Sequence, residues 1–245
     1  MALWGRVRDS DGAVHAVHVT NGRLRAVDGE QEWDSAAVSV LSPVLPSKII
    51  CVGMNYQEHA EELGVPIPSE PIIFLKPPTS VIGPGEDIIY PTSVQDLHYE
   101  GELAIVMGRR SRNIGRDDAY NYIAGFTLFN DVTARDMQLP NSQWTKAKCW
   151  DTFAPIGPFI ADDVDPADLT IRTELNGELR QQGSLQDLIF DIPTLISYIS
   201  RIMTLEEGDV IATGTPVGVG AMAVGDEVRI SAEGIGILAN SIAAE

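Results

Sequence analysis

Basic residues, cysteines and long apolar runs are all scarce in this sequence. Its 245 residues include 17 Lys and Arg against 35 Asp and Glu, and the formal net charge is −18. So acidic a chain is a poor partner for nucleic acids or anionic membrane surfaces, and we expect neither. No apolar run approaches the roughly 18 residues that a membrane-spanning helix needs, and the first residues lack an apolar leader. We therefore expect a cytoplasmic protein.

Only two cysteines are present, Cys51 and Cys149. They could form a disulfide only if the fold brought them together, and nothing in the sequence indicates an oxidising compartment, so we expect two reduced thiols. The chain is long enough to bury a sizeable core instead. Its composition, 44% hydrophobic and 21% charged, is typical of a globular protein rather than a disordered one.

The pattern of the chain changes after its first 45 residues. Residues 1–45 have the pattern of short strands joined by the turn sequences SDG and NG, and a proline-bearing segment, LSPVLPSK, follows them. We interpret them as a small N-terminal β appendage. The later sequence has strand-like apolar runs interrupted by Pro and Gly. We therefore predict a second unit, residues 46–245.

Helices are few in this second unit. Residues 55–64 (NYQEHAEELG) predict a short helix closed by Gly64, and residues 192–209 (IPTLISYISRIMTLEEGD) predict a longer helix that ends near Gly208. Residues 132–138 (VTARDMQ) could begin a third helix. Because strands do not alternate with helices, we predict an α+β fold made mostly of strands, not a doubly wound sheet.

Two glutamates stand one residue apart at the start of an apolar strand, in the segment HYEGELAIVMG. Alternate side chains of a strand share a face, so Glu100 and Glu102 carry like charges that a basic group, a shared proton or a bound cation must offset. Asp131 follows another apolar strand about 30 residues later, where strand pairing could bring it to the same point. Three carboxylates would favour Mg²⁺ or Mn²⁺. A solvated strand face is the alternative.

Six ordered segments of the chain closely resemble the fumarylacetoacetate hydrolase family: SKIICVGMNYQEHAEELG, IIFLKPPTSVIGPG, HYEGELAIVMG, AGFTLFNDVTARDMQ, WTKAKCWDTFAPIGP and GDVIATGTPVGVG. The resemblance covers about residues 46–240 and says little about the appendage. It implies a catalytic domain of the mixed β-roll type, like the C-terminal domain of proteins in this family. It also implies a divalent metal held by three carboxylates, and a homodimer. Members with one catalytic domain per chain include acylpyruvate hydrolases, oxaloacetate decarboxylases and isomerases of hydroxy-dienedioates.

The resemblance also implies a role for individual residues. The family's metal ligands fall on Glu100, Glu102 and Asp131, which are the three carboxylates that the strand pattern indicates. Its catalytic lysine near the metal falls on Lys148. That lysine stands between aromatic and small residues in the segment WTKAKCW, which indicates partial burial and a role as counter-ion.

A lid and a substrate-binding set complete the implied site. The lid carries a His-x-x-Glu pair, His59 and Glu62, whose spacing puts both side chains on one face of the helix expected there. Glu62 could then orient His59 as a general base for water, whereas the alternative is an ordinary surface helix. The substrate-contacting positions match Arg135, Gln138 and Thr215.

These interpretations predict an enzyme that cleaves a carbon–carbon bond in a small anionic β-keto or 2,4-diketo acid, through an enolate that the metal stabilises. Acylpyruvate hydrolysis and oxaloacetate decarboxylation both fit, and they differ in whether water attacks the substrate carbonyl. A second interpretation is isomerisation or decarboxylation of 2-hydroxyhepta-2,4-diene-1,7-dioate in aromatic catabolism, which needs no water-activating pair. A third is a non-catalytic calcium- or ligand-binding β-domain, which would use the carboxylates without Lys148 or His59.

Overall fold

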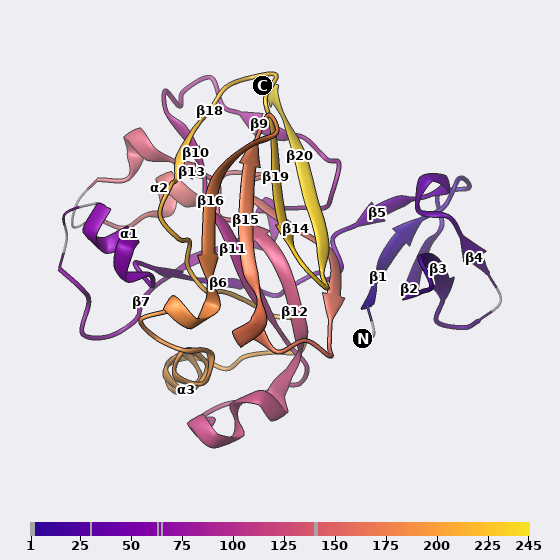
Figure 1. Ribbon diagram of the computed structural model, residues 1–245, viewed down its shortest axis with the longest axis horizontal. Coiled ribbons are helices and arrows are strands. Elements are labelled where there is room, and N and C mark those ends of the chain that lie inside the picture. The colour runs from indigo at the N-terminus through magenta and orange to yellow at the C-terminus, as the bar shows by residue number, and fades with distance from the viewer. Residues whose placement is uncertain (1–2, 30, 63, 65, 140–141) are drawn as a thin grey trace.

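Strands dominate the computed structural model, which describes residues 3–29, 31–62, 64, 66–139 and 142–245, without the side chains of His59 and Ala60 (Figure 1). The largest sheet has the spatial order β4 (Glu32–Trp33), β3 (Arg23–Ala26), β2 (Val14–Thr20), β1 (Leu3–Arg8), β14 (Ala154–Ala161), β12 (Ile123–Asn130), β11 (Gly101–Met107), β17 (Val210–Ala212), β6 (Ile49–Gly53), β7 (Ile72–Lys76). Two short strands pair outside this order: β5 (Ser39–Leu41) with β1 and β8 (Val81–Ile82) with β14. The expected α+β fold made mostly of strands is confirmed.

Two further sheets and a few helices complete the described structure. The second sheet has the order β16 (Glu178–Ser184), β15 (Thr170–Leu175), β19 (Glu227–Ala232), β20 (Gly236–Ala244), β9 (Ile88–Tyr90). The third has the order β13 (Thr133–Ala134), β10 (Leu97–Tyr99), β18 (Gly220–Met222). The α-helices are α1 (Gln57–Glu62), α2 (Thr145–Lys148) and α3 (Ile192–Ile202). Single 3-10 segments span Ser35–Ala37, Pro78–Ser80, Arg116–Tyr122, Arg135–Met137, Pro166–Asp168 and Leu185–Asp187.

Strand β11 lies at the centre of the largest sheet and is buried along its whole length. Its alternate residues enter two different cores. Leu103 and Ile105 pack in a core that also contains residues of the second sheet and of α3, whereas Ala104 and Val106 pack in a core on the opposite face. A strand buried on both faces is apolar at almost every position, which explains the unbroken apolar run of the sequence.

The N-terminal strands β1–β5 lie beside the main body and contain a small core of their own (Figure 1). They join the body where β1 pairs antiparallel with β14, at Leu3 with Ala161 and Trp4 with Ile160. The NG turn between β2 and β3 has positive φ at both residues, as a two-residue hairpin turn requires. The division into residues 1–45 and 46–245 stays a prediction.

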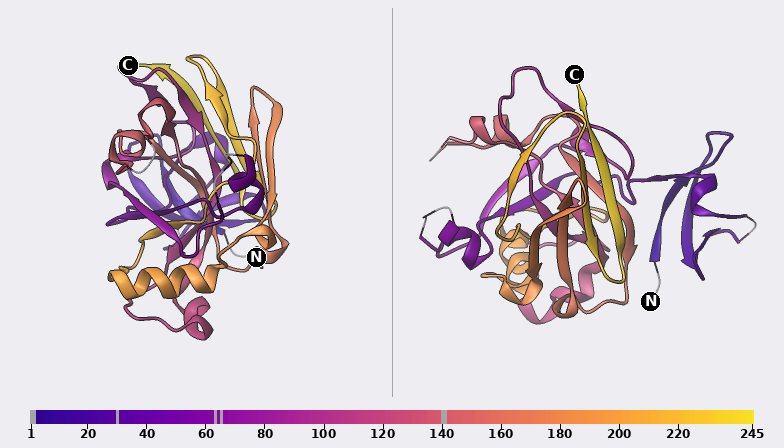
Figure 2. Two further views of the ribbon diagram at one scale, coloured as in Figure 1. Left: turned by 90° about the vertical axis from the view of Figure 1, so that its left-hand side faces the viewer. Right: turned by 45° about the horizontal axis from the view of Figure 1, so that its top comes forward.

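Two expectations about helices are wrong: the end of one helix, and the presence of another. Helix α3 lies at the end of the molecule away from the C-terminus (Figure 2) and ends at Ile202, not near Gly208. The chain leaves the helix because Leu205 is fully buried and exchanges backbone hydrogen bonds with Ser111. Residues 132–138 form strand β13 and one 3-10 turn, because Thr133 and Ala134 pair with β10.

Helix α1 matches the expected short helix. It ends at Glu62, and Gly64 follows with φ of +65° and donates its N–H to the carbonyl of Glu61. Within the described residues, the helices are all too short or too polar to cross a membrane.

Candidate active site

Three carboxylates meet where two neighbouring strands approach each other. Glu100 and Glu102 flank the first residue of β11, and Asp131 directly follows β12. The pairing of these strands sets the register, because the N–H of Asp131 donates to the carbonyl of Glu100 at 2.9 Å. Each residue offers a carboxylate oxygen, and these oxygens lie within 4.8 Å of one another. All three side chains are buried, so water screens their charges poorly.

Gly101 explains how the two glutamates share a face. Its side-chain position points to the opposite face of the strand, toward the second sheet. A Cβ atom there would lie 2.0 Å from Oγ1 of Thr173, closer than any real contact. Only glycine therefore lets β15 approach this closely while Glu100 and Glu102 point into the site.

Two cations expected from the sequence contact the carboxylates. Nζ of Lys148, on α2, lies 2.8 Å from Oε2 of Glu100 and 2.6 Å from Oδ2 of Asp131. This lysine is more deeply buried than its sequence indicates, with 2% of its surface exposed. Arg135 donates from Nη2 to Oε1 of Glu100 and from Nη1 to Oε1 of Gln138. Arg135 and Gln138 therefore meet, although they lie on a single 3-10 turn rather than on the expected helix.

A third cation, Lys76, was missed in the sequence. It ends strand β7 and is 1% exposed. Its Nζ lies 2.6 Å from Oδ1 of Asp131 and donates to the carbonyls of Val132 at 2.9 Å and Phe153 at 2.5 Å. The signal was a lysine closing the apolar strand IIFLK, directly before two prolines. A charge at the end of a buried strand needs compensation, but the sequence alone does not say which carboxylate supplies it.

The charges around the site shift several pKa values. Burial alone would raise the pKa of Glu100, but Lys148 and Arg135 outweigh it and hold that pKa below its ordinary range. Burial alone would lower the pKa of Lys148, but Asp131 and Glu100 raise it. The carboxylates that Lys148 contacts thus favour its ammonium form over the neutral amine.

Glu102 has no such compensation. Among the residues that the structure describes, no basic group forms an ion pair with it, and its Oε2 accepts a hydrogen bond from the N–H of Gly214 at 2.8 Å. Burial, and then the negative charges of Asp131 and Glu100, raise the pKa of Glu102 well above its ordinary value. A divalent cation would relieve this repulsion.

The donor set fits Mg²⁺ or Mn²⁺. Three buried carboxylates within 4.8 Å of one another form a hard, oxygen-only set, which both ions prefer over nitrogen and sulfur ligands. Glu100, Glu102 and Asp131 would hold the ion, with one oxygen each. The structure thus brings together the three residues that the sequence indicated.

Thr215 lies next to the site, in a network of hydrogen bonds that holds the backbone of Gly101. Its hydroxyl donates to the carbonyl of Gly101 at 2.9 Å and accepts a hydrogen bond from Nε2 of Gln181 at 2.8 Å. Oε1 of Gln181 in turn accepts from the N–H of Gly101 at 3.0 Å. These bonds fix the backbone between the two glutamates. The predicted contact of Thr215 with substrate stays a prediction.

The predicted lid pair lies on α1. The side chain of His59 is outside the described residues, so its role stays a prediction. Glu62 is exposed, and its Oε1 accepts a hydrogen bond from the N–H of Gly218 at 3.3 Å. This bond joins α1 to the glycine-rich turn that follows Thr215.

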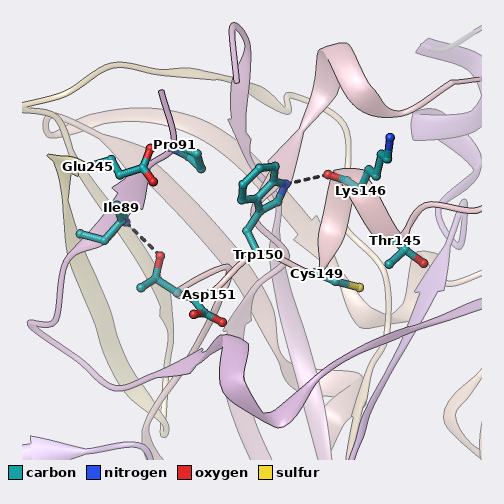
Figure 3. Close-up of a pocket in the computed structure, with 9 residues that line it drawn as sticks. Ile89, Pro91, Thr145, Lys146, Cys149, Trp150, Asp151 and Glu245 are labelled. Atoms are coloured by element: carbon teal, nitrogen blue, oxygen red, sulfur yellow. Dashed lines mark hydrogen bonds between the residues drawn. The ribbon is translucent and has the colours of Figure 1, made fainter. Parts of the chain in front are cut away.

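A hollow of about 600 Å³ is lined in part by residues of α2 and of the segment that follows it (Figure 3). Lys146, Cys149 and Trp150 line it, and the indole N–H of Trp150 donates to the carbonyl of Lys146 at 2.6 Å. The three carboxylates are not among its described lining residues. Helix α2 therefore directs Lys148 to the carboxylates and Lys146 to a separate surface.

The chain is similar to a known protein family and to several named proteins. Residues 48–243 match the family model described as fumarylacetoacetate (FAA) hydrolase C-terminal. The mitochondrial oxaloacetate tautomerase FAHD2B of Bos taurus is 42% identical over 218 residues, which cover 84% of this chain and 69% of the relative. The family match, residues 48–243, includes Lys76, Glu100, Glu102, Asp131 and Lys148.

Two solved structures share the whole fold. The 2-hydroxyhepta-2,4-diene-1,7-dioate isomerase from Mycobacterium marinum is 40% identical, with a TM-score of 0.91 over 100% of this chain and 99% of that chain. The maleylpyruvate hydrolase from Sphingobium sp. SYK-6 is 29% identical, with a TM-score of 0.83 over 100% of both chains. This chain is thus similar to proteins whose names describe a tautomerase, an isomerase and a hydrolase.

Proposed function

This chain belongs to the fumarylacetoacetate hydrolase family, and we propose that it is a Mg²⁺- or Mn²⁺-dependent enzyme that moves protons in small α-keto acids. The observation that carries the proposal is the cluster of three buried carboxylates in contact with Lys148, Arg135 and Lys76. A metal site with a purely structural role would need only the three carboxylates. The added cations suit a substrate that brings negative charge of its own.

The proposed leading reaction is interconversion of the keto and enol forms of a small dicarboxylic keto acid such as oxaloacetate. The relatives with about 40% identity carry the names of a tautomerase and an isomerase, which both describe proton movement without hydrolysis. Isomerisation of 2-hydroxyhepta-2,4-diene-1,7-dioate belongs to the same chemistry, because a proton leaves one carbon or oxygen and another joins the far end of the conjugated system.

The chain's own residues would bind and polarise the substrate. Lys148 and Arg135 can donate charge-assisted hydrogen bonds to substrate oxygens. Burial strengthens these interactions because the site excludes water. A bound Mg²⁺ or Mn²⁺ supplies Lewis-acid stabilisation of negative charge that develops on an oxygen.

Carbon–carbon bond cleavage is the second candidate, either hydrolysis of an acylpyruvate or decarboxylation of oxaloacetate. The observation that favours it is the position of Glu62, three residues after His59 on α1, where it could orient His59 to activate water. The relative named maleylpyruvate hydrolase also supports it, at lower identity.

The test compares three reactions on one preparation of metal-stripped protein, with and without Mg²⁺ or Mn²⁺. Ketonisation of enol-oxaloacetate, loss of CO₂ from oxaloacetate and hydrolysis of acetylpyruvate are followed separately. We expect metal-dependent ketonisation to be the fastest. The ratio of the other two rates to it measures the contribution of cleavage chemistry.

The matched control is Glu102→Gln, which keeps the size of the side chain and breaks no ion pair seen among the described residues. We expect it to lose metal binding and all metal-dependent turnover. A wild-type protein that binds metal but consumes none of the three compounds would contradict the proposal and favour the non-catalytic binding domain.

The homodimer and the cytoplasmic location remain proposals, and the homodimer rests on the family resemblance. Light scattering coupled to size-exclusion chromatography measures the mass in solution. A mass near 53 kDa, twice that of the 26.5 kDa chain, supports a dimer.

A further inference from the structure

Every oxygen of two proposed metal ligands already contacts a cation. On Glu100, Oε1 accepts from Arg135 and Oε2 from Lys148. On Asp131, Oδ1 lies 2.6 Å from Nζ of Lys76, and Oδ2 lies 2.6 Å from Nζ of Lys148. A divalent cation needs one oxygen from each carboxylate and repels an ammonium group at the same oxygen. An ion that takes one of these oxygens therefore weakens the contact of the cation already there.

Lys76 is poorly placed to leave. Nζ of Lys76 donates hydrogen bonds to the carbonyls of Val132 and Phe153 and forms an ion pair with Oδ1 of Asp131, an oxygen that accepts no hydrogen bond among the described residues. Its movement would leave two buried carbonyls unpaired, whereas Lys148, which is buried to the same degree, donates to no carbonyl among the described hydrogen bonds. Lys76 thus holds Oδ1 of Asp131 in place and directs Oδ2 toward the other carboxylates.

Lys148 is the one cation that contacts two of the ligands. Its Nζ bridges Oε2 of Glu100 and Oδ2 of Asp131, so its departure alone frees one oxygen on each. The described hydrogen bonds of Nζ all go to these carboxylates and none to a backbone carbonyl. No such single movement of Arg135 or Lys76 would free both ligands.

We propose that Lys148 occupies the position of the metal's charge in the metal-free protein and yields it when the ion binds, while Lys76 stays and positions Asp131. The inference rests on the proposed metal site and deepens it by giving the two lysines opposite roles. Lys148, once released from the carboxylates, has ammonium donors for the anionic substrate. Substrate binding is thereby coupled to metal binding, because the donor becomes available only after the ion has entered.

The two roles predict opposite effects of the same substitution. Isothermal titration of Mn²⁺ into metal-stripped protein should show binding that is about tenfold tighter in Lys148→Met and about tenfold weaker in Lys76→Met. If the lysines acted only through their positive charge, removal of either one would tighten Mn²⁺ binding. The sign of the Lys76→Met effect therefore separates positioning from simple charge.

Lys146→Met is the matched control, because Lys146 is exposed on the same helix and lines the separate hollow (Figure 3). It should leave Mn²⁺ affinity unchanged. Tighter binding in Lys76→Met overturns the positioning role, and unchanged or weaker binding in Lys148→Met overturns the displacement. If wild-type protein bound no Mn²⁺ at all, the proposed function itself would fail, which is a different outcome from either.

A crystal structure of the wild-type protein with Mn²⁺ bound tests the inference even if Lys76→Met does not fold. We expect Nζ of Lys148 to lie beyond hydrogen-bond distance, about 3.5 Å, of at least one of its two carboxylates. Lys76 should keep all three of its contacts. Lys148 still bridging Glu100 and Asp131 beside a bound ion would refute the displacement.

Discussion

A buried lysine is tolerated only where other groups compensate its charge. Asp131 compensates two buried lysines. Lys148 and Lys76 each contact a different oxygen of this carboxylate. Removing one partner of a buried ion pair usually costs more than the pair contributes, because the remaining charge is left in a poorly solvating environment. The single aspartate is therefore the residue on which the site depends most strongly.

At the residue scale, we predict that His59→Ala separates the two candidate reactions. The substitution should leave Mn²⁺ affinity and ketonisation of enol-oxaloacetate unchanged, because the three carboxylates and Lys148 remain. It should lower acetylpyruvate hydrolysis by about 10²- to 10⁴-fold, the usual contribution of a general base. Steady-state kinetics with both substrates measures the two effects.

Gln57→Ala is the control for this prediction. Gln57 lies on the same helix and donates to Oε1 of Glu61 at 2.9 Å, so its loss perturbs α1 without touching the pair. Undiminished hydrolysis in His59→Ala would remove the water-activating role. Equal losses in both variants would point to the helix rather than to the imidazole.

At the scale of the elements, the site depends on a close approach between β11 and β15. A Cβ atom on Gly101 would meet Oγ1 of Thr173 at 2.0 Å and Oε1 of Gln181 at 3.3 Å. Glu100 and Glu102 flank this glycine, so any shift of the strand that relieves the clash also moves two proposed ligands. The packing of the sheets and the geometry of the site are thus linked through one residue.

We predict that Gly101→Ala destabilises the protein by about 3 kcal/mol, at the upper end of what overpacking costs, and weakens Mn²⁺ binding. Urea unfolding and Mn²⁺ titration measure the two effects. Gly115→Ala is the control, because φ there is −71° and the nearest atom, Oδ2 of Asp118, lies 3.8 Å from the added Cβ. Adding Thr173→Ala to Gly101→Ala should recover part of the stability, and a double variant with no recovery would contradict the steric explanation.

Helix α3 gives a pH-dependent prediction. Oδ1 of Asp191 caps the helix by accepting the N–H of Thr194 at 2.9 Å, and Oδ2 accepts from Arg116 at 2.9 Å. Partial burial alone would raise the pKa of Asp191, but these hydrogen bonds and the charge of Arg116 lower it from 3.8. A lowered pKa means that the ionised carboxylate stabilises the fold above the unfolded pKa and loses this effect as the pH falls through the folded value.

Asp191→Ala should therefore lower the free energy of unfolding by about 1 kcal/mol at pH 7, the usual cost of losing an N-cap. The difference from wild type should start to shrink below about pH 4, the ordinary pKa of an aspartate in the unfolded chain, and should be lost as the pH falls through the lowered pKa of the folded carboxylate. Urea unfolding at several pH values measures it. A difference that stays constant down to pH 2 would show that the charge contributes nothing.

At the scale of the whole molecule, sequence patterns predict what is local and miss what depends on distant contacts. The fold class, the α1 helix and the approach of Asp131 to Glu100 and Glu102 follow from periodicity and strand pairing. The end of α3 could not be predicted, because it depends on Leu205 pairing with Ser111 in another part of the chain. Lys76 was missed for the same reason, since its partners lie directly after β12 and directly before β14, far along the sequence.

The net charge of the molecule opposes its proposed substrate. The chain carries −18 overall, whereas the three carboxylates of the site face three cations and a bound ion would add two positive charges. At an ionic strength of 0.01 M the screening length is about 30 Å, so a dianion feels the whole acidic surface before it reaches the site. At 0.1 M this length is about 10 Å, and mainly the local positive charge remains.

We therefore predict that the KM for oxaloacetate, a dianion, falls severalfold as NaCl rises from about 0.01 to 0.1 M at saturating Mn²⁺. The KM for acetylpyruvate, a monoanion, should change less, because repulsion scales with the charge of the ligand. Initial rates at fixed pH measure both, with Mn²⁺ kept saturating so that salt does not act through metal binding. A KM for oxaloacetate that rises with salt would mean that attraction to Lys148, Arg135 and the bound ion outweighs the acidic surface even at long range.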